Sequence, residues 1–397
     1  MRNFEQSEML KRLPEQFFAK LVKKTQEKIS QGYDVINLGQ GNPDLPTPDN
    51  IVRAAQDAAA KPKNHKYTPF RGFPYLKKAI ADFYKREYDV WIDPETEVAV
   101  LFGAKAGLVE VSQCLLNPGD LALLPDPGYP DYLSGTSMAD AETAFMPLLS
   151  ENDFLPDYDA LSAEDLERAK LMMLNYPNNP TAATASREFF DETVSVAKKH
   201  DICAVHDFAY ATIGFDGQKP VSFLQSEGAK DIGIEVYTLS KAYSMAGWRV
   251  AFAVGNQSVI ESINLIQDHM YCSLFGGVQE ASAEALLGDQ SGAMELVDTY
   301  AMRRQRFVKA LERIGWEAEA PKGTFFAWLP VPNGYTSEEF ADLLLEETHV
   351  VVAPGNGFGS RGEGYVRVGL LDNEERLEEA VERIGKLGMF NKESSQA

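Results

Sequence analysis

Short apolar stretches alternate with amphipathic segments through the middle of the chain. Apolar and β-branched runs predict strands at residues 98–102, 121–124, 171–175, 202–206, 234–238 and 250–254. Between them, apolar positions at helical spacing predict helices, for example at 104–116 and 188–200. This alternation is typical of a parallel sheet with crossover helices. Strands that are apolar along nearly their whole length belong in a sheet covered on both faces. We therefore expect an α/β architecture.

The two ends of the chain show a different pattern. An amphipathic helix is predicted over 14–31, and a long charged helix begins at about residue 292. The elements predicted after it are strands at 324–329, 350–353 and 365–370 and helices at 337–347 and 374–387. We therefore expect a large α/β domain over 46–290 and a small α+β domain formed by 1–45 together with 291–397.

Composition narrows the function classes. The 38 basic and 59 acidic residues give a net charge of −21, which would repel nucleic acid and anionic membranes. No apolar run is long enough to cross a bilayer, and the first residues lack the apolar stretch of a secretory signal, so we expect a cytoplasmic protein. The five histidines and three cysteines show no metal-ligand spacing, so no metal site is expected.

Residues that could bind a ligand or take part in catalysis follow the predicted strands, and open parallel sheets bind ligands at these strand ends. The strand at 98–102 leads into Gly103, Ala104 and Lys105 at a helix start, which offers backbone N–H groups to a phosphate or is simply a turn. The strand at 171–175 leads into an asparagine- and proline-rich loop at 175–181, whose composition turn geometry alone would explain.

Two further strands end in ionisable residues. Asp207 follows the strand at 202–206, where it either caps a helix or contacts a ligand. Lys241 follows the strand at 234–238, with Thr238, Ser240 and Arg249 nearby. Pyridoxal phosphate needs a lysine for its aldehyde, a carboxylate for its pyridine nitrogen, and an arginine with oriented donors for its phosphate. The strand ends together therefore predict a pyridoxal-phosphate site.

The chain resembles the class I/II pyridoxal-phosphate aminotransferases of fold type I over nearly its whole length. The matching stretches are 38–44, 67–69 with Gly72, 103–105, 127–130, 178–181, 207–210, 240–241 with Gly247 and Arg249, and 365–369. The resemblance implies a large domain with a mostly parallel seven-stranded sheet flanked by helices, and a smaller α+β domain from both chain ends.

The same resemblance implies roles for individual residues. Lys241 would bind the cofactor and move a proton, Asp207 would face the pyridine nitrogen, and Asn179 and Tyr210 the phenolic oxygen. Tyr129 would stack on the ring. The phosphate would be held by the backbone at Ala104 and Lys105, next to Gly103, by Thr238 or Ser240, and by Arg249.

Substrate and subunit contacts are implied in the same way. Arg367 would clamp the substrate carboxylate, with Gly41 and Asn179 beside it. Tyr67 would reach the phosphate of a neighbouring subunit, which implies a homodimer with shared active sites. The chain departs from the family pattern at Ala182 and Ala251, where glycine is usual, and at Tyr176, where proline is more frequent and we expect a slightly altered turn.

Transamination by a ping-pong mechanism between an L-amino acid and a 2-oxo acid is the implied reaction. The stretches 14–18 and 37–44 look most like bacterial methionine-salvage aminotransferases, which convert 4-methylthio-2-oxobutanoate to methionine. Aromatic residues such as Phe18 and Phe326 could wall an apolar side-chain pocket, whereas Arg71 is the candidate for the second clamp that a dicarboxylate needs.

Other reaction types stay open or are disfavoured. Aminotransferases for other neutral, aromatic or dicarboxylic amino acids and carbon–sulfur β-lyases share these motifs. The GxGxxG pattern at 357–362 precedes a predicted strand rather than opening a helix, which disfavours a dinucleotide site. The first 45 residues are too few and too weakly basic for an attached DNA-binding segment.

Overall fold

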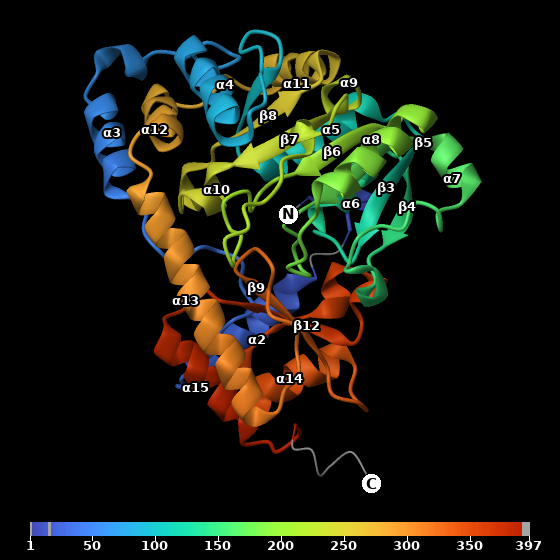
Figure 1. The fold of residues 1–397 in the computed structure, drawn as a ribbon, viewed down its shortest axis with the longest axis vertical. Helices are drawn as coiled ribbons and strands as arrows, with labels where there is room; N and C mark the ends of the chain where they lie inside the picture. The colour runs from blue at the N-terminus through green and yellow to red at the C-terminus, as the bar shows by residue number, and fades with distance from the viewer. Residues whose placement is uncertain (1, 15–16, 391–397) are drawn as a thin grey trace.

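A seven-stranded sheet forms the centre of the larger part of the molecule (Figure 1). The computed structural model describes residues 2–14 and 17–390. The strand order is β2-β8-β7-β6-β5-β3-β4, and β8 runs antiparallel to both of its neighbours. The strands are β2 (Val98–Leu101), β3 (Leu121–Asp126), β4 (Glu142–Pro147), β5 (Ala169–Asn175), β6 (Cys203–Asp207), β7 (Gly233–Thr238) and β8 (Ala251–Gly255). The α/β fold with a mostly parallel seven-stranded sheet is confirmed.

The six predicted strands are present, and β4 is the strand that the pattern did not predict. β2, β3, β7 and β8 are buried at every position, so their side chains enter cores on both faces of the sheet. β4 lies at an edge and leaves Glu142 and Phe145 exposed, which interrupts its apolar pattern.

Helices cover both faces of this sheet. Val98 and Val100 of β2 belong to the core that includes Phe83 of α4, whereas Leu101 belongs to the core that includes Leu108 of α5. The helices of this part are α3 (Asp49–Ala59), α4 (Pro74–Tyr88), α5 (Ala104–Leu115), α6 (Asp131–Met138), α7 (Ala163–Arg168), α8 (Arg187–His200), α9 (Ala229–Ile232), α10 (Leu239–Ala242), α11 (Gln257–Met270) and α12 (Gly276–Leu287).

A second, smaller unit combines the two ends of the chain. Its antiparallel sheet has the order β11-β12-β9, and β1 pairs with β10 in parallel. The elements are α2 (Phe18–Ser30), β1 (Ile36–Asn37), α13 (Ser291–Ile314), β9 (Phe326–Pro330), α14 (Ser337–Thr348), β10 (Val350–Val351), β11 (Ala353–Pro354), β12 (Tyr365–Gly369) and α15 (Glu374–Gly385). The short α1 (Glu8–Lys11) lies instead against α6 of the larger part. The long α13 descends from the larger part into this unit (Figure 1).

One core holds the smaller unit together. Ile36 and Leu38 from the N-terminal segment pack with Phe307, Leu344 and Val368 from the C-terminal region. α2 packs against this unit, where Lys24 pairs with Asp342 of α14 at 2.6 Å. The N-terminal segment thus joins the C-terminal region, as the sequence suggested, while the domain boundaries at 45/46 and 290/291 stay a prediction.

Candidate active site

A cleft of about 530 Å³ opens where β2, β5, β6 and β7 end and meet the smaller unit. Its lining includes most of the residues that the sequence predicted for a cofactor and substrate site. They are Gly41, Ala104, Lys105, Tyr129, Asn179, Asp207, Tyr210, Thr238, Ser240, Lys241, Arg249 and Arg367. The fold therefore brings side chains from both units to one place.

Lys241 lies in the short helix that begins directly after β7. The hydroxyl of Thr238 accepts a hydrogen bond from the backbone N–H of Ser240 (3.2 Å), which fixes the turn from strand to helix. The Lys241 Nζ donates to the carbonyl oxygen of Gly41 at 2.7 Å. Burial, helped by the positive charges of Arg367 and Arg249, lowers the pKa of Lys241 to about 8. This amine is therefore half neutral at about pH 8, where an ordinary lysine is still almost fully protonated.

Asp207 ends β6 and presents a carboxylate to the cleft. Its Oδ2 accepts a hydrogen bond from the hydroxyl of Tyr132 at 2.8 Å, whereas its Oδ1 accepts none of good geometry from the described residues. Burial raises the pKa of Asp207 to about 6, although the hydrogen bond from Tyr132 opposes this shift. A buried acceptor left open in this way fits a pyridine N–H.

The asparagine-rich loop after β5 connects Asp207 with the smaller unit. Asn175 Nδ2 donates to the backbone oxygen of Asp207 (2.7 Å), and its Oδ1 accepts from the backbone N–H of Asn179 (2.7 Å). The Asn179 side-chain oxygen in turn accepts from Arg367 Nη1 (2.8 Å). Ala182 follows with φ +62°, a conformation that glycine adopts more easily, so alanine strains this turn.

Hydrogen-bond donors and positive charge converge at the start of α5. Its N-cap Gly103 has φ +87°, and a Cβ there would lie 2.4 Å from Arg249 Nη2, so only glycine allows this close approach. Among the residues that the structure describes, no side chain caps the first N–H groups of α5. Thr238 Oγ1 and Ser240 Oγ lie 2.9 Å apart beside them. These groups fit a phosphate.

Arg367 is a buried cation that has no acidic side chain as a partner within the described residues. Nη1 bonds to Asn179, and Nη2 donates to the backbone oxygen of Gly39 at 3.1 Å. The guanidinium carbon lies 4.0 Å from the ring centroid of Phe326 and 4.6 Å from that of Phe358. Burial lowers the pKa of Arg367 to about 10. The group is therefore placed to accept a carboxylate from outside the chain.

Comparison with known proteins identifies the family. The sequence profile described as aminotransferase class I and II matches residues 33–384. The chain belongs to this family. It is a pyridoxal-phosphate-dependent aminotransferase, and the open groups around Asp207, Arg249 and Lys241 fit that cofactor.

Individual relatives cover almost the whole aminotransferase. It is 64% identical over 391 residues, 98% of each chain, to the L-glutamine--4-(methylsulfanyl)-2-oxobutanoate aminotransferase of Bacillus subtilis. It is 44% identical to the LL-diaminopimelate aminotransferase of Syntrophobacter fumaroxidans over 97% of this chain and 99% of that one. The substrate-bound structure of BacF from Bacillus subtilis matches with a TM-score of 0.94 and 50% identity, covering 98% of this chain and 100% of that one.

Three predicted residues of the aminotransferase are placed differently from the rest. Tyr67 is 92% exposed and lies outside the cleft of its own chain. Gly103 does not line the cleft but allows Arg249 to approach α5. Lys105 lines the cleft, but its ammonium pairs with Asp131 at 2.9 Å. Arg71, the candidate second clamp, is already bound to Glu261 and Asp268.

Sequence reasoning missed several residues around the aminotransferase site. Phe358 reaches the cleft through the turn after β11, which carries no local signal. Tyr132 lies three residues after Tyr129 at the start of α6, and that helical spacing could have revealed it.

A buried hydrogen-bonded pair was also missed. His206 directly precedes Asp207, and its Nδ1 lies 2.8 Å from Glu235 Oε2. The Nε2 of His206 accepts from the backbone N–H of Tyr176 at 3.2 Å, which ties β6 to the asparagine-rich loop. Parallel pairing of β6 with β7 places His206 opposite Glu235, a register that the sequence pattern does not specify.

Proposed function

We propose that this aminotransferase transfers the amino group of L-glutamine to 4-(methylsulfanyl)-2-oxobutanoate, which yields methionine. The relative that is 64% identical over nearly the full chain carries this activity in its name. The observation that carries the proposal in this chain is the aromatic wall around Arg367: apart from Lys241 and Arg249, which this proposal assigns to the cofactor, the cations considered as a second clamp, Arg71 and Lys105, are held in ion pairs.

The wall suits a neutral thioether side chain. Phe326 and Phe358 flank the Arg367 guanidinium, and the ring of Phe18 lies 5.1 Å from that of Phe358. Sulfur packs favourably against aromatic rings, and the apolar surface favours burial of a methylsulfanyl group. A dicarboxylate would need another free cation, but the ion pairs of Arg71 and Lys105 occupy the nearby candidates.

The residue roles follow from the geometry and stay part of this proposal. Arg367 binds the α-carboxylate through its fork of N–H groups, with Asn179 holding the guanidinium in place. Asp207 would face the pyridine nitrogen with its open oxygen, and Tyr129 would pack on the ring. Asn179 and Tyr210 would bind the phenolic oxygen, while the start of α5 with Thr238, Ser240 and Arg249 would hold the phosphate.

Lys241 performs the proton transfer in this proposal. When bound, pyridoxal phosphate withdraws electrons from the Cα of the amino acid. The Lys241 amine must be neutral to accept a proton from Cα, and burial beside Arg367 and Arg249 favours the neutral form. The hydrogen bond to the Gly41 carbonyl oxygen holds Nζ on the side of the cleft that we assign to the substrate.

A homodimer in the cytoplasm completes the proposal. Tyr67 is exposed on the surface of its own chain, as is Phe70 three residues later, and a second copy would use Tyr67 at its own phosphate site. No helix of the described residues is long and apolar enough to cross a membrane. Light scattering on the purified protein tests the dimer, and a monomer at working concentration would contradict it.

Absorbance spectroscopy of the purified holoenzyme tests the substrate assignment. Methionine and glutamine, added separately, are expected to discharge the visible band of the bound cofactor, and 4-(methylsulfanyl)-2-oxobutanoate should restore it. Discharge by aspartate or LL-diaminopimelate but not by methionine would overturn the assignment. Release of pyruvate from cystathionine would instead indicate a β-lyase.

A further inference from the structure

The GxGxxG stretch at 357–362 lies where the two units of the molecule meet. It belongs to the connection between β11 and β12 of the smaller unit, which forms two short 3₁₀ turns, Gly355–Phe358 and Ser360–Gly362. The second turn lies against β3 of the larger part. We call residues 355–362 the glycine loop.

Three hydrogen bonds tie the glycine loop to the end of β3. The carboxylate of Asp126, which is 3% exposed, accepts from the hydroxyl of Ser360 at 2.7 Å and from the backbone N–H of Arg361 at 3.0 Å. The backbone N–H of Gly128 donates to the carbonyl oxygen of Phe358 at 2.8 Å. Each of these bonds crosses from one unit to the other, and both carboxylate oxygens of Asp126 are used on the loop.

Glycines allow the loop to approach its neighbours so closely. Gly359 has φ +132°, and a Cβ at this position would clash with Oδ1 of Asp126. A Cβ at Gly357 would clash with the ring of Phe17. Packing within the protein therefore accounts for the first two glycines of the GxGxxG stretch.

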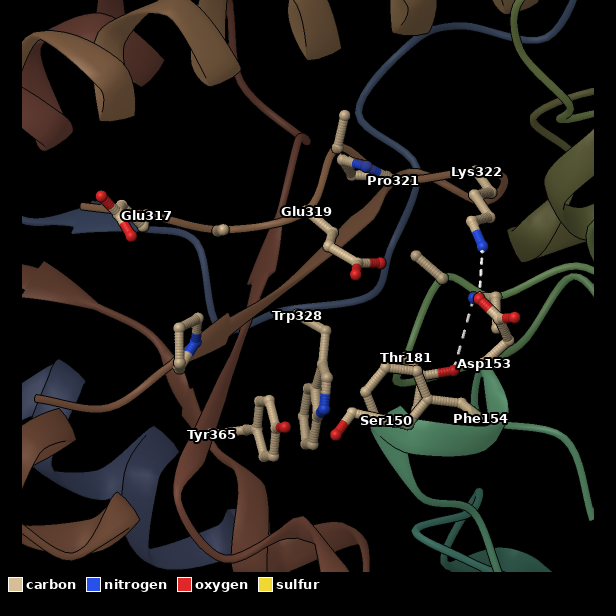
Figure 2. A pocket seen from close by; sticks show the side chains of 15 residues that line it. Ser150, Asp153, Phe154, Thr181, Glu317, Glu319, Pro321, Lys322, Trp328 and Tyr365 are labelled. Atoms are coloured by element: carbon tan, nitrogen blue, oxygen red, sulfur yellow. Dashed lines mark hydrogen bonds and ion pairs between the residues drawn. The ribbon is translucent and has the colours of Figure 1, made fainter. Parts of the chain in front are cut away.

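Phe358 is the residue of the glycine loop that lines the cleft. Its ring centroid lies 4.6 Å from the guanidinium carbon of Arg367 and 5.1 Å from the ring centroid of Phe18. The ring of Trp328, which stacks on Tyr365 (Figure 2), meets Phe358 edge-on at 6.0 Å. The side chain of Phe358 thus packs among groups of the smaller unit, while the larger part holds its backbone.

We propose that Asp126 is a positioning residue for substrate binding, because it fixes Phe358 against the Arg367 guanidinium. The two bonds to Asp126 hold the residues that follow Phe358, and the bond from Gly128 holds Phe358 itself. With its backbone held, the ring of Phe358 restrains the guanidinium, which must keep its orientation to bind a carboxylate through two N–H groups. This inference rests on the proposed role of Arg367.

Removal of the Asp126 carboxylate tests the inference on the holoenzyme. Asp126→Ala is expected to raise the KM for the amino acid about tenfold and to change kcat by less than about twofold, because Lys241 keeps its own contacts. A loss of folded enzyme would instead lower kcat and leave KM unchanged, so the two effects can be separated.

Two milder variants accompany it. Asp126→Asn keeps an oxygen that can accept from the Arg361 N–H, so it should recover most of the parental KM. Ser360→Ala removes one of the two bonds from an exposed position and should raise KM about threefold. Ser360→Ala decides the test if Asp126→Ala does not fold.

Asp153→Ala is the matched control. Asp153 also joins the two units, through an ion pair with Lys322 at 2.8 Å, but it does not line the cleft (Figure 2). The substitution removes the same chemical group, and KM and kcat are expected to stay at their parental values. A rise in KM equal to that of Asp126→Ala would show that any weakened contact between the units raises KM, and it would overturn the specific role of Asp126.

A double-mutant cycle tests whether Asp126 acts through Phe358. Phe358→Ala alone should raise KM, and addition of Asp126→Ala should raise it no further, because the ring that Asp126 positions is already absent. Fully additive effects of the two substitutions would overturn this route.

The inference and the proposed function can fail separately. All measurements use an amino acid that discharges the visible band of the bound cofactor, so they do not require methionine to be the substrate. An unchanged KM in Arg367→Leu would overturn the proposed role of Arg367 and this inference with it. A KM that rises in Arg367→Leu but not in Asp126→Ala or Ser360→Ala would overturn only the positioning role of Asp126.

Discussion

Two buried arginines of the smaller unit differ in the groups that accept their hydrogen bonds, and this difference distinguishes a structural arginine from one proposed to bind the substrate. Arg303 on α13 and Arg367 on β12 are 4% and 6% exposed. Arg303 grips both carboxylate oxygens of Asp44 at 2.8 Å each, whereas Arg367 has only an amide and a backbone oxygen as acceptors. A buried charge without a counter-ion is costly. This difference supports the proposal that the substrate supplies the counter-ion of Arg367, whereas Asp44 of the fold is the counter-ion of Arg303.

Like Arg367, Lys241 is a basic residue of the cleft without an acidic partner among the described residues. Its substitution gives the largest predicted effect. Lys241→Ala should lower kcat about 10⁴-fold, because the variant loses both the cofactor attachment point and the proton carrier. Circular dichroism should show an unchanged fold, since the substitution removes a buried amine rather than an ion pair. Transamination near the parental rate would remove Lys241 from the proposed mechanism.

Arg367→Leu separates the two arginines directly. We expect kcat/KM to fall about 10³-fold for every amino acid, because all share the α-carboxylate, while stability stays equal or rises as a buried unpaired charge disappears. Steady-state kinetics and urea unfolding measure the two quantities. A KM unchanged from the parental value would show that Arg367 does not bind the substrate carboxylate.

Arg303→Leu is the matched control. It leaves Asp44 without its partner, so we expect a loss of stability of about 2–3 kcal/mol, below the range for a fully buried pair because Asp44 is a quarter exposed. The effect on kcat/KM should be far smaller than that of Arg367→Leu. The opposite order of effects would show that Arg303, and not Arg367, serves the substrate.

The pH dependence of cofactor binding also distinguishes Arg367 from Arg303. Lys241 has a lowered pKa of about 8, so its neutral fraction falls about tenfold per pH unit below that value. The rate at which the apoprotein binds pyridoxal phosphate should therefore rise between pH 6 and 8 and then level off, as followed by absorbance. Arg367→Leu should move the midpoint to higher pH, because it removes a positive charge beside Lys241, whereas Arg303→Leu should not.

Tyr132→Phe gives the smallest predicted effect. It removes the hydrogen bond to Asp207 Oδ2, which raises the pKa of Asp207 further and weakens its charge opposite the pyridine nitrogen. We expect a loss of about tenfold in kcat, with the acid side of the kcat profile moved to higher pH. A profile that matches the parental one would show that Tyr132 only packs against Tyr129.

Much of the fold was predictable because its signals are local. The strands that end in Asn175, Asp207 and Thr238 are mostly apolar runs, and the predicted bounds lie within two residues of the observed ones. β4 was missed because its edge position leaves Glu142 and Phe145 exposed, so the chain there lacks a buried-strand pattern.

The candidate site was predictable where chemistry follows a strand in sequence. Asp207 and Lys241 come directly after β6 and β7, so the rule that parallel sheets bind ligands at strand ends was enough to select them. Arg367 and Asn179 lie 188 residues apart in sequence, and no local pattern indicates the bond between them. Their pairing was implied only by the resemblance to a known family.

By itself, the sequence determined which segments become strands and helices, which ends of strands carry reactive groups, and the family of the protein. Those properties depend on neighbours along the chain and on side-chain chemistry. Only the tertiary structure decided that Arg71 is paired with Glu261 and Asp268, that Phe358 joins Phe18 at the cleft, and that His206 is bonded to Glu235. These properties depend on contacts between distant segments, whose distances and charges are set when the two units pack together.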